Sequence, residues 1–345
     1  MKGINFPFFF LHIGGILMAK RLRLFSEEKW KQVNNESKML LDDYLLELQS
    51  QGKSEKTIYQ YKADIRAFLC WGVEGAGNKS ILELKKRTFR QFFIEMKNNG
   101  TSPARINRFQ SSIRNLLAFA EQEEDEYDYD RNAMSTIKGI QGEKVRDIYF
   151  LTDKQIEIIY NHLLEKKEYQ KALYLALSYD SAGRRNEIAQ VKKDGFLIKN
   201  QTNQVIGKRG KKFKLLYFSR SKVAARLWFE QRGEDDFETL WMRKDLKEPI
   251  SAYEAGYNWT VEFRSILQEE TGEFIPFNPH SFRHSALENF SNGTHYVLRE
   301  MDKEKLDINA LKVLANHSDI STTQSYLMDR DSEVLANALG IELED

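Results

Sequence analysis

The chain has little of the chemistry that holds small secreted proteins together. Its 345 residues include one cysteine, Cys70, and five prolines. A single thiol excludes a disulfide framework and gives no support to a cysteine-rich metal site, so a reducing, intracellular compartment is the simplest interpretation. The formal net charge is only +1, which argues against a uniformly basic nucleic-acid coat but leaves room for local basic faces.

A long apolar run is also lacking. Residues 1–18, MKGINFPFFFLHIGGILM, are apolar, but this run is too short for a membrane-spanning helix. It lacks the longer positive start and the small-residue cleavage site of a signal peptide. Gly14 and Gly15 precede Met18 by a few codons, and glycine codons can spell a bacterial ribosome-binding site. We therefore hypothesise that translation starts at Met18; peptides from residues 1–17 in the native protein would refute this.

Four amphipathic helices are predicted over about residues 36–120. The first stops at Gly52, Ser54 caps the second, and the third ends at Gly100. The fourth begins at Ser102-Pro103, a cap followed by proline in the first turn. Its apolar residues recur with a period that fits a helix buried on one side: Ile106, Phe109, Ile113, Leu116, Leu117 and Ala120.

This first unit is locally basic, with 14 Lys/Arg against 9 Asp/Glu over residues 36–120. A solvated face and a phosphate-contacting face both fit this pattern, and charge alone favours the solvated face. Residues 121–130, EQEEDEYDYD, carry seven acids and mark a linker or a solvated helix end. The basic residues flank the stripes of the second and fourth helices: Lys53, Lys56, Lys62, Arg66, Arg105, Arg108 and Arg114.

A second unit begins where Thr152 and Gln155 form a capping box. Helices are predicted over 152–165 and 168–181, with a further helix over 184–192. Residues 201–219 predict a short hairpin, with Val205 and Ile206 before a Gly/Lys turn. The remainder is mostly helical. The fold class is therefore mainly α, with a small sheet in the second unit.

Four short stretches of this unit carry reactive side chains: SAGRRNEIAQV (181–191), VIGKRGKKFK (205–214), NPHSFRHSALENF (278–290) and VLANHSDISTTQSYL (313–327). Each has a plain structural explanation. The arginines of the first can pair with Glu187, and the second can be a solvated turn. His280 and Arg283 share a face in the first turn of a helix, where an anion binds well. A tyrosine such as Tyr326 is most often a packing residue.

The order of these stretches is more specific than any one of them. Arg-x-x-Glu, a Gly-Lys hairpin, His-x-x-Arg-His, and then a histidine with a tyrosine nine residues later resemble the tyrosine recombinases. That family includes phage and conjugative-element integrases and the Xer-type recombinases. HSDISTTQSY (317–326) is an especially specific match. The resemblance covers about residues 36–340.

The resemblance implies the domain organisation and the roles of six residues. After an N-terminal extension (1–35) come a helical, SAM-like core-binding domain (36–122), a linker (123–145) and an α+β catalytic domain (146–340). Lys211, Lys212 and Lys214 leave the register of the hairpin lysine open. The implied catalytic set is Arg184 and Arg283 as phosphate clamps, Lys208 as the hairpin lysine, His280 and His317 as activating histidines, and Tyr326 as the nucleophile.

The implied chemistry is self-sufficient. Two arginines can neutralise the non-bridging oxygens of a phosphodiester, and this removes the need for a metal. A phosphotyrosyl link keeps the bond energy, so rejoining needs no cofactor. The implied partners are a specific double-stranded DNA site, three further copies in a homotetramer and, in some systems, accessory DNA-bending proteins; no membrane is implied.

Three positions depart from the family pattern. Asn316 replaces the usual glycine before His317, Gly183 replaces a bulky apolar residue before Arg184, and the second hairpin strand lacks a common proline. A divergent member can lose cleavage and keep DNA binding, so a repressor built on a recombinase scaffold is the rival hypothesis. A type IB topoisomerase has similar chemistry, but the helical first domain and the tail motif argue against it.

Overall fold

The computed structural model describes residues 24–123, 125–141, 148–197 and 200–316. They form two compact units, which divide between Arg146 and Asp147. The hypothesis about Met18 and the predictions for His317 and Tyr326 concern residues outside these ranges. Within them, no helix is both long enough and apolar enough to span a bilayer.

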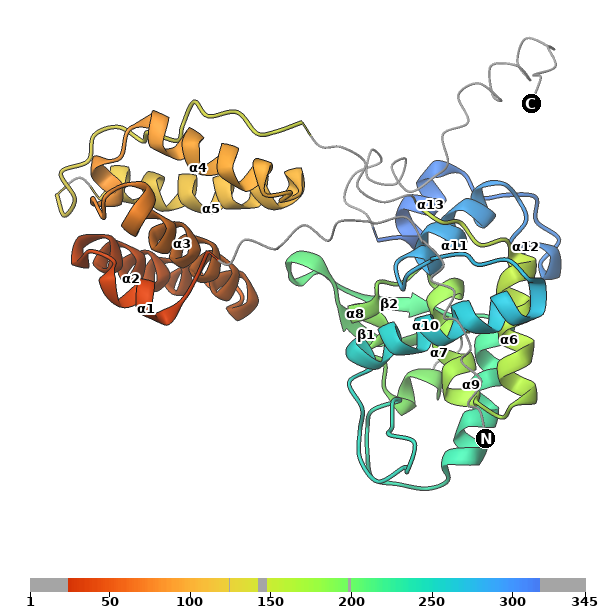
Figure 1. The fold of residues 1–345 in the computed structure, drawn as a ribbon. Coiled ribbons are helices and arrows are strands. Elements are labelled where there is room, and N and C mark those ends of the chain that lie inside the picture. Colours follow the sequence, from red (N-terminus) through yellow and green to blue (C-terminus); the bar gives the residue numbers. More distant parts are fainter. Residues whose placement is uncertain (1–23, 124, 142–147, 198–199, 317–345) are drawn as a thin grey trace, which may run out of the picture. The chain divides into compact units, whose positions relative to one another are not determined.

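The first unit is made of helices, as its apolar periodicity predicts (Figure 1). Ser54 caps its second long helix by accepting the Thr57 N–H at 3.2 Å, and Gly52 ends the preceding one at φ 67°, a conformation that suits glycine. The elements are α1 (Glu27–Gln32), α2 (Asn35–Ser50), α3 (Glu55–Gly75), a 3-10 turn (Ile81–Glu83), α4 (Lys86–Asn98) and α5 (Pro103–Gln122).

The core of this unit is apolar and aromatic. Every residue of the predicted α5 stripe, from Ile106 to Ala120, is at most 1% exposed. Phe68 of α3 packs edge-on against Phe92 of α4, with ring centroids 5.0 Å apart. Such burial on one face stabilises helices that would be marginal alone.

The acidic stretch after α5 is followed by a segment that packs back onto the same unit. Tyr127 and Tyr129 are buried against its core. The Asn107 side chain on α5 pairs with the backbone of Ile140 in both directions, at 2.8 and 2.7 Å. Arg114 donates to backbone carbonyls in the same segment, including that of Ile137 at 2.8 Å.

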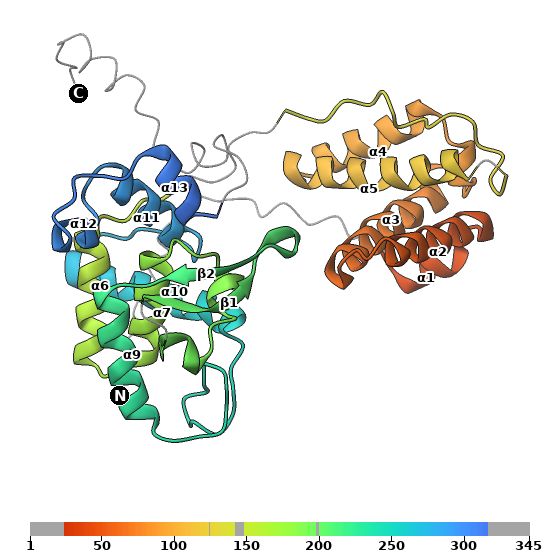
Figure 2. The same cartoon turned by 180° about the vertical axis from the view of Figure 1, so that it is seen from behind.

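The second unit is mainly helical with one two-stranded antiparallel sheet (Figures 1 and 2). Its central helix, α7, lies between α10 on one side and α9 with the sheet on the other. The elements are α6 (Asp153–Glu165), α7 (Tyr169–Asp180), α8 (Arg185–Ile188), a 3-10 turn (Lys193–Leu197), β1 (Gln201–Ile206), a second 3-10 turn (Lys208–Gly210), β2 (Lys212–Leu216), α9 (Ser219–Arg232), α10 (Ala252–Thr271), α11 (Ser281–Ser291), α12 (Tyr296–Glu300) and α13 (Ile308–Leu314).

The predicted capping box and hairpin are both present. The Thr152 N–H donates to Gln155 Oε1 at 2.9 Å, and the Gln155 N–H donates to Thr152 Oγ1 at 3.2 Å. In the hairpin, Val205 pairs with Phe213 across the strands. A Gly-Lys turn between two short β runs thus forms as its residues indicate.

The predicted helix over 184–192 is wrong in its second half, because α8 ends at Ile188. Tertiary partners take over the backbone beyond that point. The Lys192 N–H donates to the Asn203 side chain at 2.9 Å, and Lys192 forms an antiparallel bridge with Thr239. Long-range pairing of this kind overrides local helix propensity.

Candidate active site

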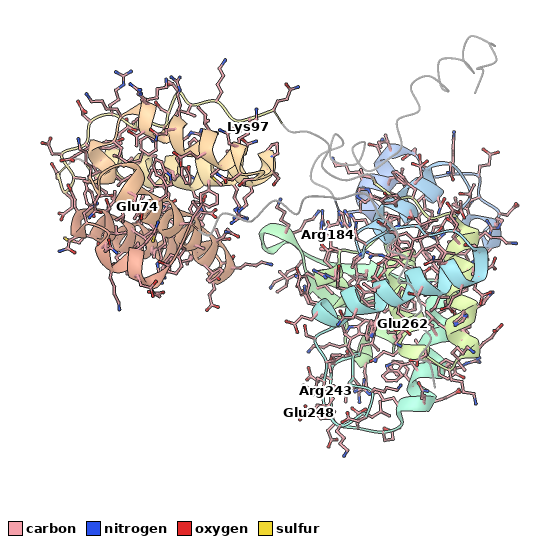
Figure 3. The ribbon with its side chains drawn as sticks, in the orientation of Figure 1. Glu74, Lys97, Arg184, Arg243, Glu248 and Glu262 are labelled. Carbon is pink, nitrogen blue, oxygen red and sulfur yellow. The ribbon has the colours of Figure 1, made fainter. Side chains whose placement is uncertain are left out.

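Arg184 is positioned by a buried carboxylate. It precedes the first turn of α8, and its backbone N–H donates to Glu187 Oε2 at 2.7 Å while its Nη1 donates to Oε1 at 3.0 Å. The Glu187 side chain is 2% exposed and that of Arg184 is 27% exposed. The ion pair expected as the plain structural explanation is therefore present, and it holds a guanidinium that still reaches solvent (Figure 3).

The glycine before Arg184 fits a crowded loop. A Cβ at Gly183 would lie 2.8 Å from Ile188 Cδ1 and 2.8 Å from Ser181 Oγ. Such distances force a shift of the surroundings, so a bulky residue cannot occupy this position in the present packing. This departure from the family pattern is thus built into the local structure.

Arg283 holds two loops together from the inside of the unit. It is 1% exposed on α11. Its Nη1 donates to the Ala182 carbonyl at 2.5 Å, and its Nη2 donates to the Ala315 carbonyl at 2.6 Å. These carbonyls lie two residues before Arg184 and two residues before His317, respectively. One side chain therefore fixes the approach to both predicted site residues.

Both of these loops contain a left-handed residue. Ala182 has φ 49° and Asn316 has φ 52°. Outside glycine, asparagine adopts this conformation most readily, and helices often end with it. Asn316 follows the end of α13, so its departure from the family's glycine keeps the backbone conformation that glycine would supply. Ala182 has no such ease, and its strain is typical of functional loops.

His280 caps the start of α11 within a group of positive charges. Its ring lies edge-on to that of His284, with centroids 4.9 Å apart. Desolvation lowers the pKa of His280 to about 4, and the charges of His284, Arg283 and Arg184 contribute further. The imidazole is therefore neutral near pH 7 and able to accept a proton.

Lys208 stands on the hairpin turn, exposed to solvent. The base of this turn is bound to the segment that follows α8, because Gln190 and the Ile206 backbone exchange hydrogen bonds of 2.9 and 2.8 Å. A Cβ on Gly207 would lie 3.2 Å from Glu187 Oε1 and 2.6 Å from the Phe213 ring. The turn thus begins against the carboxylate that holds Arg184.

The structure therefore gathers three of the six predicted residues around α8 and the start of α11: Arg184, His280 and Arg283. Lys208 is exposed on the hairpin turn, next to the glycine that lies against Glu187. His317 and Tyr326 lie outside the described ranges. The sequence did not predict the hydrogen bonds between Gln190 and Ile206, or the two carbonyls that Arg283 binds. No local signal marks them, because they act through partners about 16 to 100 residues away. Glu187 was visible only as the third residue after Arg184.

The basic flank of α5 is partly engaged inside its own unit. Arg108 makes a two-pronged pair with the buried carboxylate of Asp64, with distances of 2.9 and 2.8 Å. Arg114 binds backbone carbonyls. Arg105 makes no ion pair within the described part of the chain, and its guanidinium lies 5.8 Å from the centre of the Phe109 ring. Fewer arginines on this flank are therefore available for phosphate contacts than the sequence suggests.

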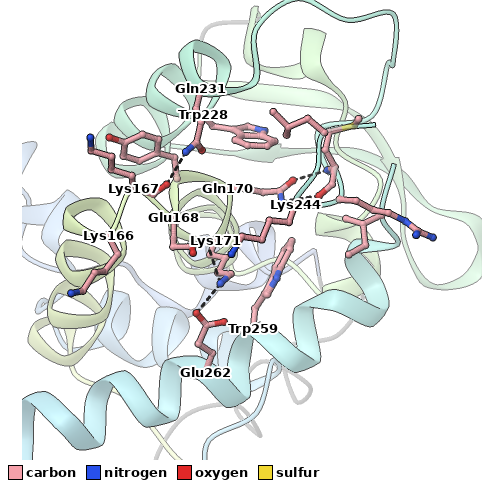
Figure 4. Close-up of a pocket in the computed structure, with 15 residues that line it drawn as sticks. Lys166, Lys167, Glu168, Gln170, Lys171, Trp228, Gln231, Lys244, Trp259 and Glu262 are labelled. Atoms are coloured by element: carbon pink, nitrogen blue, oxygen red, sulfur yellow. Dashed lines mark hydrogen bonds and ion pairs between the residues drawn. The ribbon is translucent and has the colours of Figure 1, made fainter. Parts of the chain in front are cut away.

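A separate hollow of about 540 Å³ lies where the α6–α7 turn, α9 and α10 meet (Figure 4). Its lining includes none of the predicted catalytic residues. Lys171 is held there between Glu168 and Glu262, at 3.3 and 2.7 Å, and the Gln170 side chain pairs with the Met242 backbone. These groups join α7 to α10 and to the 242–250 loop. Nowhere in the described parts of the chain do three or more metal-ligating side chains converge.

One unit contains two arginines, a neutral histidine and a hairpin lysine. Such groups can bind a phosphodiester and transfer protons to and from the oxygens that attack and leave it. With a separate, locally basic helical unit, they indicate an enzyme of DNA strand exchange. The chain belongs to the phage integrase family: the model of that family matches residues 149–333, and the phage integrase N-terminal SAM-like domain matches residues 41–124. It is thus a tyrosine-type site-specific DNA recombinase.

Curated relatives and solved structures agree with this family. The SPbeta prophage-derived recombinase-like protein YomM of Bacillus subtilis is 27% identical over 336 residues, which cover 93% of this chain and 96% of YomM. Tyrosine recombinase XerA of Thermococcus onnurineus is 24% identical, with 83% and 89% covered. A lambda integrase dimer bound to a COC' core site matches with a TM-score of 0.63 at 16% identity, covering 85% of this chain and 95% of that one. The Tn1549 transposon integrase in complex with circular intermediate DNA gives 0.64 at 16% identity, with 87% and 98% covered.

Proposed function

We propose that this protein is an integrase of a phage or another mobile element. It cuts and rejoins double-stranded DNA at a specific site in the cytoplasm, through a 3′-phosphotyrosyl bond at Tyr326. We also propose the domain bounds that the sequence predicts, with the catalytic domain over 146–340. YomM supports the proposed origin, because it is described as prophage-derived.

The observation that carries the proposal is the bridge made by Arg283. Its guanidinium binds the carbonyls of Ala182 and Ala315, at 2.5 and 2.6 Å. The bridge thereby ties the loop that leads to Arg184 to the chain that leads to His317. A transition state for phosphoryl transfer needs these groups on one phosphate, and positioning before binding lowers the cost of assembling them.

The proposed roles follow from the chemistry of each group. Arg184 stabilises the negative charge that grows on the non-bridging oxygens. Arg283 does so through the second N–H of its Nη atoms, because the first ones are held by the Ala182 and Ala315 carbonyls. His280, neutral above about pH 4, accepts the proton of the Tyr326 hydroxyl as that oxygen attacks phosphorus. Lys208 gives a proton to the 5′ oxygen that leaves, and His317 donates a hydrogen bond to the phosphate. The second strand's 5′ hydroxyl reverses these steps and releases the tyrosine.

We further propose a homotetramer on DNA. A lambda integrase tetramer bound to a Holliday junction matches this chain with a TM-score of 0.63. The catalytic unit carries an apolar groove of about 790 Å³, lined among others by Phe218, Phe290 and Leu306. The C-terminal residues 331–345 contain Val334, Leu335, Leu339 and Ile341, so we place this segment in the groove, from the same or a neighbouring copy. If a neighbouring copy supplies the segment, its deletion should abolish assembly on DNA while leaving the monomer folded; if the same copy supplies it, the deletion should lower the stability of the monomer.

A nicked suicide substrate tests the function. The duplex carries the element's recombination site with a nick that lets the cleaved end diffuse away, so the covalent intermediate accumulates. Wild-type protein should give an adduct on a denaturing gel, and Tyr326→Phe should give none. Tight binding to a verified site without an adduct would instead support the repressor. Relaxation of any supercoiled plasmid would support the topoisomerase.

A further inference from the structure

The two adjacent arginines of α8 have different surroundings. Arg184 pairs with Glu187, whereas Arg185 makes no ion pair with another described residue. The Arg185 guanidinium instead lies 3.9 Å from the centre of the Tyr253 ring, at the start of α10. A cation held flat on an aromatic face keeps the edge of its planar fork available for hydrogen bonds.

The helix that supplies Tyr253 has an unusual exposed face. Its exposed residues include the acids Glu254 and Glu269 but no lysine or arginine, and the part-exposed Arg264 donates to the Phe277 carbonyl. The other acids of α10 are Glu262, which pairs with Lys171, and Glu270, which pairs with His162. The rest of the exposed face consists of aromatic, amide, hydroxyl and small apolar groups: Tyr253, Tyr257, Asn258, Val261, Ser265 and Gln268.

We propose that Arg185, oriented by Tyr253, reads the edge of a guanine in the recombination site. This inference rests on the proposed function, because it assigns sequence recognition to a residue next to the proposed clamp. Arginine binds guanine O6 and N7 with two parallel hydrogen bonds, a pairing that discriminates between bases. The aromatic, amide and hydroxyl groups on the exposed face of α10 suit base edges and methyl groups in a groove.

A phosphate contact would look different. Proteins follow the DNA backbone with clusters of lysine and arginine, and the exposed face of α10 contains neither. A merely structural stack is the other alternative, in which Arg185 covers Tyr253 and meets no DNA. The three alternatives predict different responses of binding to base sequence and to salt.

The experiment uses the full chain and a library of DNA duplexes with randomised sequence. Bound duplexes are selected and sequenced for the wild type, for Arg185→Ala, and for Arg226→Ala as a matched control from the exposed face of α9. We expect Arg185→Ala to lose the guanine preference at one base pair, with an affinity loss of about 10- to 100-fold for duplexes that carry it. The control should keep the wild-type preferences.

Substitution of Tyr253 tests the orienting stack separately. Tyr253→Phe keeps an aromatic face and should keep the preference, while Tyr253→Ala should weaken it by less than Arg185→Ala does. A uniform loss of affinity with a shallower salt dependence in Arg185→Ala would overturn the inference in favour of a phosphate contact. Unchanged preferences, or a wild type that selects no sequence, would also overturn it.

The two proposals fail in different ways. Formation of the phosphotyrosyl adduct by the wild type, on a nicked duplex of the selected sequence or of the element's own site, reports on the function and not on Arg185. An adduct together with unchanged preferences in Arg185→Ala would refute only the base reading. A guanine preference lost in Arg185→Ala, with no adduct in the wild type, would refute cleavage and keep the reading.

Discussion

The cores of the two units of this protein differ in how many charged groups they bury. The N-terminal unit is closed by aromatic and aliphatic side chains, such as Phe68, Phe92 and Phe109. The catalytic unit buries charged and polar groups as well, including Asp153, Asp180 and Arg283. The difference teaches that the first unit is arranged for stability and the second for holding loops in place, since buried polar groups specify position more than they add stability.

One carboxylate in each unit makes the contrast concrete. Asp64 on α3 accepts from Arg108, whose side chain is 44% exposed, and from Ser112 at 3.1 Å. Asp153 on α6 accepts from Arg299 at 2.7 Å, from Arg220 and Tyr179 at 3.2 Å each, and from the backbone of Tyr296. The first ties two neighbouring helices together, and the second joins four elements of the catalytic unit.

The largest expected effect comes from the two arginines that we propose as phosphate clamps. Arg184→Lys and Arg283→Lys should each slow adduct formation by about 10²-fold or more, because an ammonium cannot replace a two-pronged guanidinium. Only Arg283→Lys should also lower stability, by about 2 kcal/mol, since one ammonium cannot serve both the Ala182 and Ala315 carbonyls. Single-turnover cleavage and urea unfolding measure the two quantities. Equal stability of both variants would contradict the bridging role.

Asp153→Asn should destabilise the catalytic unit by about 3 kcal/mol, because it leaves the largely buried Arg220 with only its longer ion pair to Glu157. Burial alone would raise the pKa of Asp153, but Arg299 and Arg220 outweigh it and the pKa is lowered. A lowered pKa adds stability that is present above about pH 4 and is lost as the pH falls further. Wild type and variant should therefore converge in acid. Hydrogen exchange resolved by unit measures this, and parallel curves down to pH 2 would refute it.

Asp64→Ala should have a smaller effect, confined to the N-terminal unit. We expect a loss of about 1–2 kcal/mol, because Arg108 can turn to solvent while Ser112 remains buried. The same exchange experiment reads the outcome, with the catalytic unit as the internal control. A loss larger than that of Asp153→Asn would break the comparison between the two cores.

The smallest effect concerns protonation. All histidines in the described ranges belong to the catalytic unit. In the DNA-free protein, the His280 imidazole should titrate near pH 4, below its ordinary value of 6.5, because the ring is desolvated and lies near positive charge. His284→Gln removes one of these charges and should move the titration upward by a fraction of a unit. Nuclear magnetic resonance of labelled histidine reads it, and titration above pH 6.5 in the wild type would contradict the site's electrostatics.

The N-terminal unit could be predicted from sequence almost element by element, because its helices carry their apolar stripes and caps locally. Ser54 and the stripe from Ile106 to Ala120 are confirmed. In the catalytic unit, the capping box at Thr152 and the hairpin were predicted from local sequence in the same way, and both are confirmed. The end of α8 at Ile188 did not follow from local pattern, since Lys192 is taken into a bridge with Thr239, a partner 47 positions away.

The sequence indicated the candidate site only through the order in which its motifs occur. Arg184, His280 and Arg283 lie close together, but no residue next to them in the sequence predicts that Arg283 binds the carbonyls of Ala182 and Ala315. The departures from the family pattern acquire reasons only in three dimensions. Gly183 stands where a Cβ would strike Ile188, and Asn316 keeps a left-handed backbone.

The two hydrogen bonds between Gln190 and the Ile206 backbone limit how far the hairpin lysine can move. Lys208 stands two residues after Ile206. Two residues of extended chain span at most about 7 Å, so with the anchor fixed the Lys208 backbone can travel only within a sphere of that radius. The number of residues between Ile206 and Lys208 therefore limits how far Lys208 can reach toward the leaving oxygen that we propose it protonates. One residue inserted there would lengthen this span by half, and one deleted would halve it.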